Sequence, residues 1–343
     1  MGVDISSLVA GRPVELVELS GRHIAVDAFN ILYQFLAIIR DRMTGEPLRD
    51  SQGRVTSHLS GLLYRTSNLI EAGIKPVFVF DGKPPEFKHA TVEERKAARE
   101  EAKRKWEEAK ERGEPAMKYA QAASRLTDEM IESAKQLLDY LGVPHLQAAS
   151  EGEMQCAYMC KTGDVWAAAS QDFDALMTGS PRLVRNLSIS GRRKVPKKET
   201  YIEVKPEIIE LDKILEGLGV TQEQFIIMGI LIGTDYSPGV KGVGPKTALQ
   251  LVKEHRTLEE VLKNVEWESE VDAESVFQFL LNPAVKKDYK NKLVWEEPDY
   301  GKLAEFMVEE HDFSRERVQK VIDRLQAATE KGTQSSLKGW LEK

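Results

Sequence analysis

The stretch Ser150–Leu176, SEGEMQCAYMCKTGDVWAAASQDFDAL, combines four carboxylates with the pattern of one helix and one short buried strand. Two glutamates begin the helical part, and two aspartates follow the apolar run 165–169. These acids are Glu151, Glu153, Asp172 and Asp174. Because open α/β sheets bind ligands beyond the carboxyl ends of their strands, the stretch predicts an α/β fold with all four acids at one rim.

Structural roles for the same residues stay open at this point. Ser150 and Glu153 have the spacing of a capping box, in which Glu153 only caps a helix. Asp172 and Asp174 are also common turn residues. Acids elsewhere in the chain must decide between a metal site and these roles.

The composition predicts a globular protein with a highly charged surface. The 343 residues allow one large domain or two smaller ones, and 41% of them are hydrophobic. We find no apolar run of about 18 residues and no signal pattern at the N-terminus. Cys156 and Cys160 are too few for a zinc site, so we interpret them as reduced packing residues of a cytoplasmic protein.

The formal net charge of −7 argues against a generic nucleic-acid binder, because phosphate binding requires cations. Net charge does not describe how charge is distributed, however. A protein that gathers carboxylates around metal ions is acidic overall and still carries basic stripes.

Two further acids follow predicted strands in the first hundred residues. The β-prone run His23–Val26 ends at Asp27, and the run Val77–Phe80 ends at Asp81. A helical pattern, residues 58–71, lies between them. This alternation predicts a mainly parallel twisted sheet with helices on both faces.

A long helix with segregated charge is predicted from Thr91 to Arg112, and Gly113 and Pro115 end it. At about 100° per residue its cations and the preceding lysine form one stripe, and its glutamates lie mostly opposite. The stripe consists of Lys88, Arg95, Lys96, Arg99, Lys103 and Lys110. This segregation favours a helix that presents its basic side to a polyanion, with a solvated helix or coiled-coil arm as the alternative.

A glycine-rich loop lies between two predicted helices, residues 222–232 and 247–255. The loop, residues 239–246, lets backbone N–H groups approach a phosphate at the start of the second helix. It resembles the hairpin by which repair proteins hold a duplex backbone without reading sequence. A plain glycine turn is the alternative.

Asp235, directly before this loop, brings the number of candidate acids to seven. Buried together, seven carboxylates would repel each other and their pKa values would rise. Two divalent ions about 4 Å apart relieve that repulsion, activate a water and stabilise the leaving oxygen of a phosphodiester. An all-oxygen ligand set predicts Mg²⁺, with Mn²⁺ as a substitute, rather than zinc.

Six motifs in order resemble the flap endonuclease family, and archaeal members in particular. They are AVDAFNILYQF, VFVFDGKPPEFK, SEGEMQCAY, ASQDFDAL, GTDYSPGVKGVGPKTAL and the tail QSSLKGWL. The resemblance extends from Gly2 to the tail. It implies a structure-specific nuclease of DNA replication, including Okazaki fragment maturation, and repair. Such an enzyme cuts 5′ flaps near the single-strand/double-strand junction and acts as a 5′-3′ exonuclease.

The resemblance also implies roles for individual residues. Its metal ligands are Asp27, Asp81, Glu151, Glu153, Asp172, Asp174 and Asp235. Lys88 and Arg95 match the cations that reach the scissile phosphate, and Tyr33 matches the base-stacking aromatic. Arg40 and Thr56 match positions near the 3′-flap pocket, and the basic helix matches an arch that the flap passes. Candidate DNA contacts of the arch and the loop are Arg99, Lys103, Lys241, Gly242, Gly244 and Lys246.

The glycine loop matches a hairpin that also holds K⁺, although Gly239 stands where many relatives have serine. Gln334, Leu337, Trp340 and Leu341 match a peptide that docks onto the sliding clamp. We therefore expect a nuclease domain over residues 1–328, with the arch at about 83–123 and a helix-hairpin-helix-like motif at about 224–256. A flexible clamp-binding tail, residues 329–343, follows, and the free protein is expected to be a monomer.

Two other functions are compatible with parts of this pattern. One is a related nuclease, either a junction resolvase or a pure 5′ exonuclease; the length of the arch and the clamp motif favour the flap enzyme instead. The other is a non-catalytic protein that binds DNA structures or the clamp. The complete acid set argues against it, because a binding module has no reason to gather acids beside DNA.

Overall fold

A seven-stranded sheet forms the centre of the computed structural model, which describes residues 3–41, 44–85, 88–113, 117–188, 191–194 and 201–341. The strand order is β1-β9-β6-β5-β2-β3-β4. The five strands from β6 to β4 are parallel, and β9 alone runs in the opposite direction, pairing antiparallel with both β6 and β1, which confirms the mainly parallel sheet. The strands are β1 Arg12–Pro13, β2 His23–Asp27, β3 Lys75–Phe80, β4 His145–Gln147, β5 Ala167–Ala169, β6 Arg182–Arg185 and β9 Glu207–Glu210.

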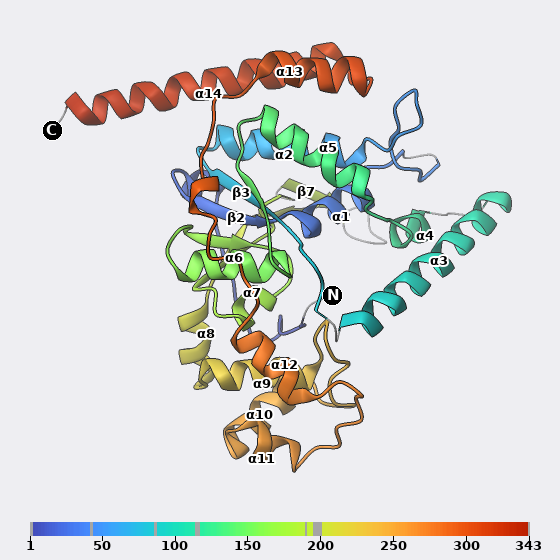
Figure 1. Ribbon diagram of the computed structural model, residues 1–343, viewed down its shortest axis with the longest axis vertical. Coiled ribbons are helices and arrows are strands. Elements are labelled where there is room, and N and C mark those ends of the chain that lie inside the picture. The colour runs from blue at the N-terminus through green and yellow to red at the C-terminus, as the bar shows by residue number, and fades with distance from the viewer. Residues whose placement is uncertain are drawn as a thin grey trace.

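Side-chain alternation along the central strands divides the hydrophobic core between the two faces of the sheet. In β3, Val77 and Val79 belong to one buried cluster, whereas Phe78 and Phe80 belong to the other. A group of helices therefore lies on each side of the sheet, some of them against the strands and others packed on those helices (Figure 1). The first group contains α6 Gly152–Lys161, α7 Asp174–Met177, α8 Leu211–Leu218, α9 Gln222–Ile232, α10 Pro245–His255, α11 Leu258–Leu262 and α12 Ala273–Leu281. The second contains α1 Ala28–Ile38, α2 Ser57–Glu71, α5 Asp128–Tyr140, α13 Tyr300–Ala304 and α14 Arg315–Leu341.

The expected helices and strands correspond closely to the observed ones where they are long. The helix expected at 222–232 is α9, and the one expected at 58–71 is α2, which begins one residue earlier. Outside the main sheet, β7 Gly191–Lys194 and β8 Tyr201–Val204 pair with each other in a separate two-stranded sheet. The short strands β1, β4 and β9 were not predicted, because two to four residues carry too little periodicity.

An arm projects from the body of the molecule and is formed by α3 His89–Glu111 and α4 Met117–Ala122 (Figure 1). It confirms the long helix expected between Thr91 and Arg112, and Gly113 ends that helix in the left-handed region with φ +66°. We call this arm the arch.

The C-terminal helix differs from its expected length. We expected a flexible tail over residues 329–343, but α14 continues to Leu341. The side chains of the expected clamp-binding residues Gln334, Leu337, Trp340 and Leu341 lie outside the described ones. Their role stays a prediction.

No single helix among the described residues is both long and apolar enough to cross a membrane, although the bent pair α8 and α9 meets the same criteria by length and composition.

Candidate functional site

Strand ends and helix starts bring the seven predicted acids around one cavity of about 860 Å³. Asp27 is the last residue of β2 and also the N-cap of α1, and Asp81 directly follows β3. Asp172 and Asp174 follow β5, the two glutamates lie at the start of α6, and Asp235 follows α9. We call this space, at the carboxyl edge of the parallel strands, the acid cavity.

Each of the seven carboxylates accepts a hydrogen bond that orients it. Backbone N–H groups of Asn30, Gly152, Ala175 and Val3 donate to Asp27 (3.0 Å), Asp81 (2.7 Å), Glu153 (2.9 Å) and Asp174 (3.1 Å). The Asn30 side chain donates to Asp172 (3.1 Å), and the cations Lys88 and Arg95 donate to Glu151 and Asp235 (both 2.5 Å). Fixed orientation of acids from five separate segments is typical of a preorganised site rather than of incidental turns.

Burial and mutual repulsion disfavour ionisation of the inner acids. Burial raises the pKa of Asp27 well above its ordinary value, and the charge of Asp81 raises it further. Burial and then Glu151 raise the pKa of Asp81 to about 6, and burial and then Asp235 raise that of Asp174 to about 7. The cavity therefore holds more negative charge than its surroundings neutralise, and a bound cation would relieve this repulsion.

Two cations from the base of the arch reach into the acid cavity. Lys88 is buried and pairs with Glu151, and its Nζ lies 3.9 Å from Asp235 and 5.6 Å from the centre of the Tyr236 ring. Burial alone would raise the pKa of Asp235, but the hydrogen bond from Arg95 holds it below its ordinary value. Lys88 and Arg95 thus provide part of the positive charge that the acids require.

The donor set suits a hard divalent cation, because every candidate ligand is a carboxylate. No three carboxylate, imidazole or thiolate groups in the described part of the chain lie close enough together to hold one metal ion as they stand. Glu151 and Asp235 are engaged with Lys88 and Arg95 instead. The seven acids therefore fit a hard divalent cation in the chemistry of their oxygens and in their shared location, and a bound ion would require them to move closer together.

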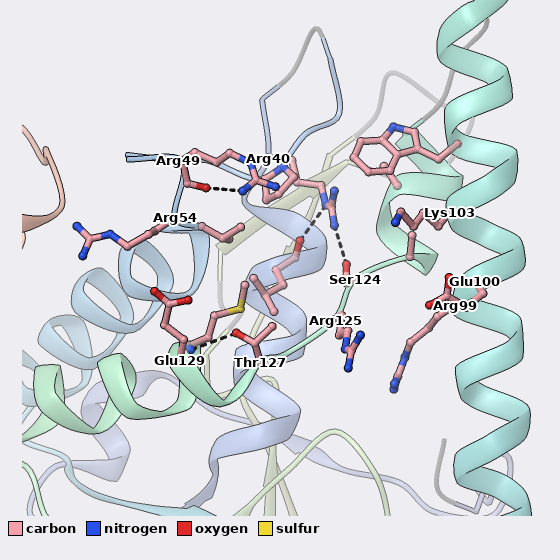
Figure 2. Close-up of a pocket in the computed structure, with 18 of the residues that line it drawn as sticks. Arg40, Arg49, Arg54, Arg99, Glu100, Lys103, Ser124, Arg125, Thr127 and Glu129 are labelled. Carbon is pink, nitrogen blue, oxygen red and sulfur yellow. Dashed lines mark hydrogen bonds between the residues drawn. The ribbon is translucent and has the colours of Figure 1, made fainter. Parts of the chain in front are cut away.

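The residues expected to contact DNA fall into different environments. Tyr33 lines the acid cavity, and the guanidinium of Arg99 lies 5.3 Å from the centre of its ring. Arg40 donates to the carbonyl oxygens of Leu36 and Gly45 and to Ser124 Oγ, as Figure 2 shows for Ser124. Arg40 therefore ties the foot of the arch to α1 and the loop that follows it. Thr56 is buried at the start of α2.

A second cavity, of about 630 Å³, lies between α3, the loop 47–55 and the start of α5 (Figure 2). Arg99 lines this cavity and also contacts Tyr33 of the acid cavity, so the two spaces adjoin along the arch. Its lining contains the acids Glu100 and Glu129 and the cations Arg40, Arg49, Arg54, Lys96, Arg99, Lys103 and Arg125. We call this space the cationic cavity. Five of the six cations of the expected basic stripe line one of these cavities, whereas Lys110 pairs with Glu46.

The glycine-rich loop between α9 and α10 has the conformation of a tight turn. Gly239 and Gly242 have φ angles of +77° and +82°. A side chain on Gly239 would approach the backbone nitrogen of Gly233 to 2.6 Å, so this position requires glycine in the present fold. Lys241 is exposed, and Gly244 is the N-cap of α10. The loop can thus present N–H groups and a cation together.

Two contributors to the acid cavity escaped the sequence analysis. Asn30 links Asp27 and Asp172 through its backbone and side-chain N–H groups, and Tyr236 packs against Lys88. Asn30 could have been found from its position three residues after the N-cap aspartate in VDAFN. Its contact with Asp172 spans 142 residues and has no local signal.

Comparison with known proteins assigns this architecture to a class. The XPG N-terminal domain matches residues 4–102, and the XPG I-region matches residues 142–235. The chain is thus a nuclease of the XPG type, a hydrolase.

Relatives of similar length narrow the class. The chain is 54% identical over 353 residues to Flap endonuclease 1 of Hyperthermus butylicus, with 100% of both chains covered. It is 52% identical over 346 residues to Flap endonuclease 1 of Pyrococcus horikoshii, covering 100% of this chain and 99% of the relative. The solved flap endonuclease-1 from Methanococcus jannaschii superposes with a TM-score of 0.74 at 37% identity, covering 95% of this chain and 98% of that one. The chain belongs to the flap endonuclease 1 family.

Proposed function

We propose that this protein is a divalent-metal-dependent flap endonuclease that cuts 5′ flaps near the junction of single-stranded and double-stranded DNA. The proposed function also includes 5′-3′ exonuclease activity and a role in DNA replication, including Okazaki fragment maturation, and in DNA repair. The single observation that carries the proposal is the acid cavity: seven oriented carboxylates, with Lys88 and Arg95 among them, beside a cavity lined by cations. A protein that only bound DNA would have no use for this concentration of acids.

The cofactors in this proposal are two Mg²⁺ ions, with Mn²⁺ able to substitute. Such ions supply a nucleophilic water and stabilise charge on the leaving oxygen. Asp27, Asp81, Glu151, Glu153, Asp172, Asp174 and Asp235 would hold them. Lys88 and Arg95, released from Glu151 and Asp235, would orient the scissile phosphate and offset its developing charge. Tyr33 would stack on the exposed base beside the junction.

Other surfaces would position the DNA. Arg99 and Lys103 of the arch would contact the flap backbone, and Lys241, Gly242, Gly244 and Lys246 would hold the duplex at the glycine loop, with K⁺ as a possible further ligand there. Arg40 and Thr56 would shape the 3′-flap pocket indirectly, since both are occupied or buried within the protein. The peptide in the C-terminal tail would bind the sliding clamp. The protein would act inside the cell, and we expect the free protein to be a monomer.

Cleavage of a labelled double-flap DNA in Mg²⁺, compared with a blunt duplex and a four-way junction, tests the function. The proposal predicts cleavage at the flap junction; preferential cutting of the four-way junction would favour a resolvase, and binding without cutting would favour a non-catalytic protein.

Substitution of the acids tests the site. Asp81→Asn or Asp174→Asn should abolish cleavage and leave flap-DNA affinity within about an order of magnitude, because cations elsewhere hold the phosphates. Each variant should also show a smaller rise in melting temperature with Mg²⁺ than the wild type. Near-normal cleavage by either variant at saturating Mg²⁺ would contradict the metal assignment.

A further inference from the structure

Trp106 is the only aromatic side chain among the described residues that line the cationic cavity. It lies on α3 in the same helical row as Lys96, Arg99 and Lys103, at spacings of three and four residues. Lys110 Nζ lies 5.5 Å from the centre of the indole ring. The arch thus presents an aromatic surface at the end of a row of cations.

The indole N–H of Trp106 is buried and has no hydrogen-bond partner in the described part of the chain. Buried donors are normally paired, because an unsatisfied N–H loses its bonds to water without replacement. A ligand that brings hydrogen-bond acceptors into the cavity would supply a partner after a small rotation of the ring. The unpaired N–H is therefore a second observation that favours a ligand at this wall.

Cations that follow a backbone, interleaved with an aromatic ring on which a base stacks, are the usual means of binding single-stranded nucleic acid. The walls of the cationic cavity match this pattern, with seven cations and two acids in its lining. An acidic peptide would use the cations as well, but it would not require the flat aromatic face. The combination favours a nucleotide strand.

The position of Trp106 along the arch defines which part of a strand it can reach. Arg95 contacts the acid cavity, and Trp106 lies 11 residues further along α3, or about 16 Å at the helical rise. Arg99, between them, contacts both cavities. A strand that left the acid cavity along this face would reach Trp106 with a nucleotide several positions from the reacting phosphate.

We propose that Trp106 stacks on one unpaired base of the single-stranded 5′ flap where it passes through the cationic cavity. This inference rests on the proposed function, because it takes the flap as the strand in that cavity. The cations that α3 contributes to the lining, Lys96, Arg99 and Lys103, contact the backbone wherever it lies, whereas the ring contacts a base at a defined distance from the cut. Trp106 is therefore a specificity-determining residue that makes binding sensitive to a missing base at one flap position.

Binding of flap DNAs that carry a single abasic site at successive flap positions tests the proposal. Affinities are measured without divalent metal for the full-length wild type and for Trp106→Ala, Trp106→Leu and Trp106→Phe. In the wild type one position should weaken binding about tenfold when its base is missing, as expected for loss of one base–aromatic stack. Trp106→Phe should retain this position dependence, and Trp106→Ala and Trp106→Leu should abolish it.

The leucine variant separates stacking from packing, because leucine fills space without an aromatic face. If Trp106 only packs the arch, Trp106→Leu will show the same dependence of binding on the position of the abasic site as the wild type. That result would refute the proposal. Lys105→Ala is the matched control, since Lys105 is the neighbouring exposed residue and pairs with Glu101. It should leave the position dependence unchanged, and its loss in this control would equally overturn a specific role for Trp106.

The two hypotheses fail separately in this design. A wild-type protein that cuts flap DNA but binds every abasic flap equally would refute the role of Trp106 and leave the proposed function intact. A protein that senses one missing base but does not cut flaps would support the stacking contact and refute the proposed function.

Discussion

At the scale of single residues, the acid cavity is controlled by the balance between buried carboxylates and the few cations that reach them. Asp27 and Glu153 are surrounded mainly by other acids, and burial followed by neighbouring charge raises the pKa of both. Asp235 differs because Arg95 donates to it. Aspartates in the same cavity thus differ in pKa because each contacts different neighbours, and these neighbours are distant from it in the sequence.

His58 is a buried base outside the acid cavity, and burial lowers its pKa instead of raising it. It is almost fully buried in α2, its Nε2 lies 2.9 Å from Ser133 Oγ, and its Nδ1 has no partner among the described residues. Burial, and then the charge of His311, lower its pKa to about 3. These contacts support a structural role for His58 rather than that of a general base.

His58 should therefore make the protein acid-sensitive. The unfolded chain takes up the proton near pH 6.5 and the folded chain only near pH 3, so the stabilising contribution is complete above pH 6.5 and is lost as the pH falls toward 3. The wild type should lose about 1.4 kcal/mol of its free energy of unfolding per pH unit below 6.5 because of His58, and the His58→Gln variant should not show this loss. Denaturant titrations at pH 7.5 and 4.5 measure the free energy of unfolding of both proteins. If the variant and the wild type differ in this free energy by the same amount at both pH values, the lowered pKa of His58 is contradicted.

Gly239 supplies a second prediction at this scale. Gly239→Ser should lower the free energy of unfolding by about 1–3 kcal/mol, because a Cβ there would collide with the backbone of Gly233. Gly242→Ser is the matched control, since Gly242 also has positive φ but nothing lies within 4 Å of its would-be Cβ. Thermal melting of the two variants separates the effect of the collision from that of backbone strain. Equal decreases in stability would show that the loop accommodates serine at position 239 without a collision.

At the scale of elements, the arch joins the two cavities. The base of α3 sends Lys88 and Arg95 to the acids, and its middle lines the cationic cavity. Its far end is tied to the body by ion pairing of Lys110 with Glu46, and Arg40 binds the segment after α4. Few of the side chains that the structure describes in the arch are buried, Ala102, Ala109 and Ala120 being exceptions. Polar contacts rather than a hydrophobic core hold the arch in place.

Arg95→Ala should lower the single-turnover rate of cleavage far more than it lowers DNA affinity. The reason is that Arg95 lies among the acids, where it would act on the reacting phosphate rather than on the distant backbone. Arg104→Ala is the control, because Arg104 is exposed and faces Glu108 of the same helix. Single-turnover kinetics and equilibrium binding measured together decide the matter. A loss of affinity alone would reassign Arg95 to ordinary phosphate contact.

DNA should also reduce the motion of the arch. With little apolar surface, residues 88–118 should exchange their amide hydrogens rapidly in the free protein and more slowly on flap DNA. Hydrogen exchange measured with and without substrate tests this expectation, and equal protection in both states would count against it.

At the scale of the whole molecule, the C-terminal segment closes the fold. After α12 the chain passes the start of β3, where Trp295 Nε1 donates to the Pro76 carbonyl at 3.1 Å. His311 Nδ1 then lies 3.1 Å from Asp50 in the loop between α1 and α2. Val318, Val321, Ile322 and Leu325 of α14 are buried in the cluster shared with α2. Residues up to about 325 are thus part of the domain core.

Deletion of residues 333–343 should leave stability and intrinsic flap cleavage nearly unchanged, because the core residues of α14 that the structure describes, from Val318 to Leu325, lie before this point. The same deletion should abolish stimulation by the sliding clamp, and Trp340→Ala with Leu341→Ala should have nearly the same effect. Calorimetric titration of the clamp with the full-length and shortened proteins measures the contact. Equal affinities would mean that the clamp binds the folded domain instead.

The sequence alone determined the parallel sheet, the long helices and the identity of the seven acids. These features have short-range signatures: alternating apolar residues, capping residues, and acids directly after strands such as Asp27 and Asp81. The motifs that carry the family resemblance are equally local. The short edge strands and the full length of α14 were missed because their patterns are too weak to read locally.

Only the tertiary structure decided which acids are oriented, neutralised or left with raised pKa values. Asn30 reaches Asp172, Lys88 reaches Glu151 and Arg95 reaches Asp235 across 142, 63 and 140 residues. Likewise, Trp106 enters the lining of the cationic cavity only because α3 folds back toward the loop 47–55 and the start of α5. Hydrogen bonds, burial and Coulomb forces depend on distances in space, and these distances exist only once the chain has packed.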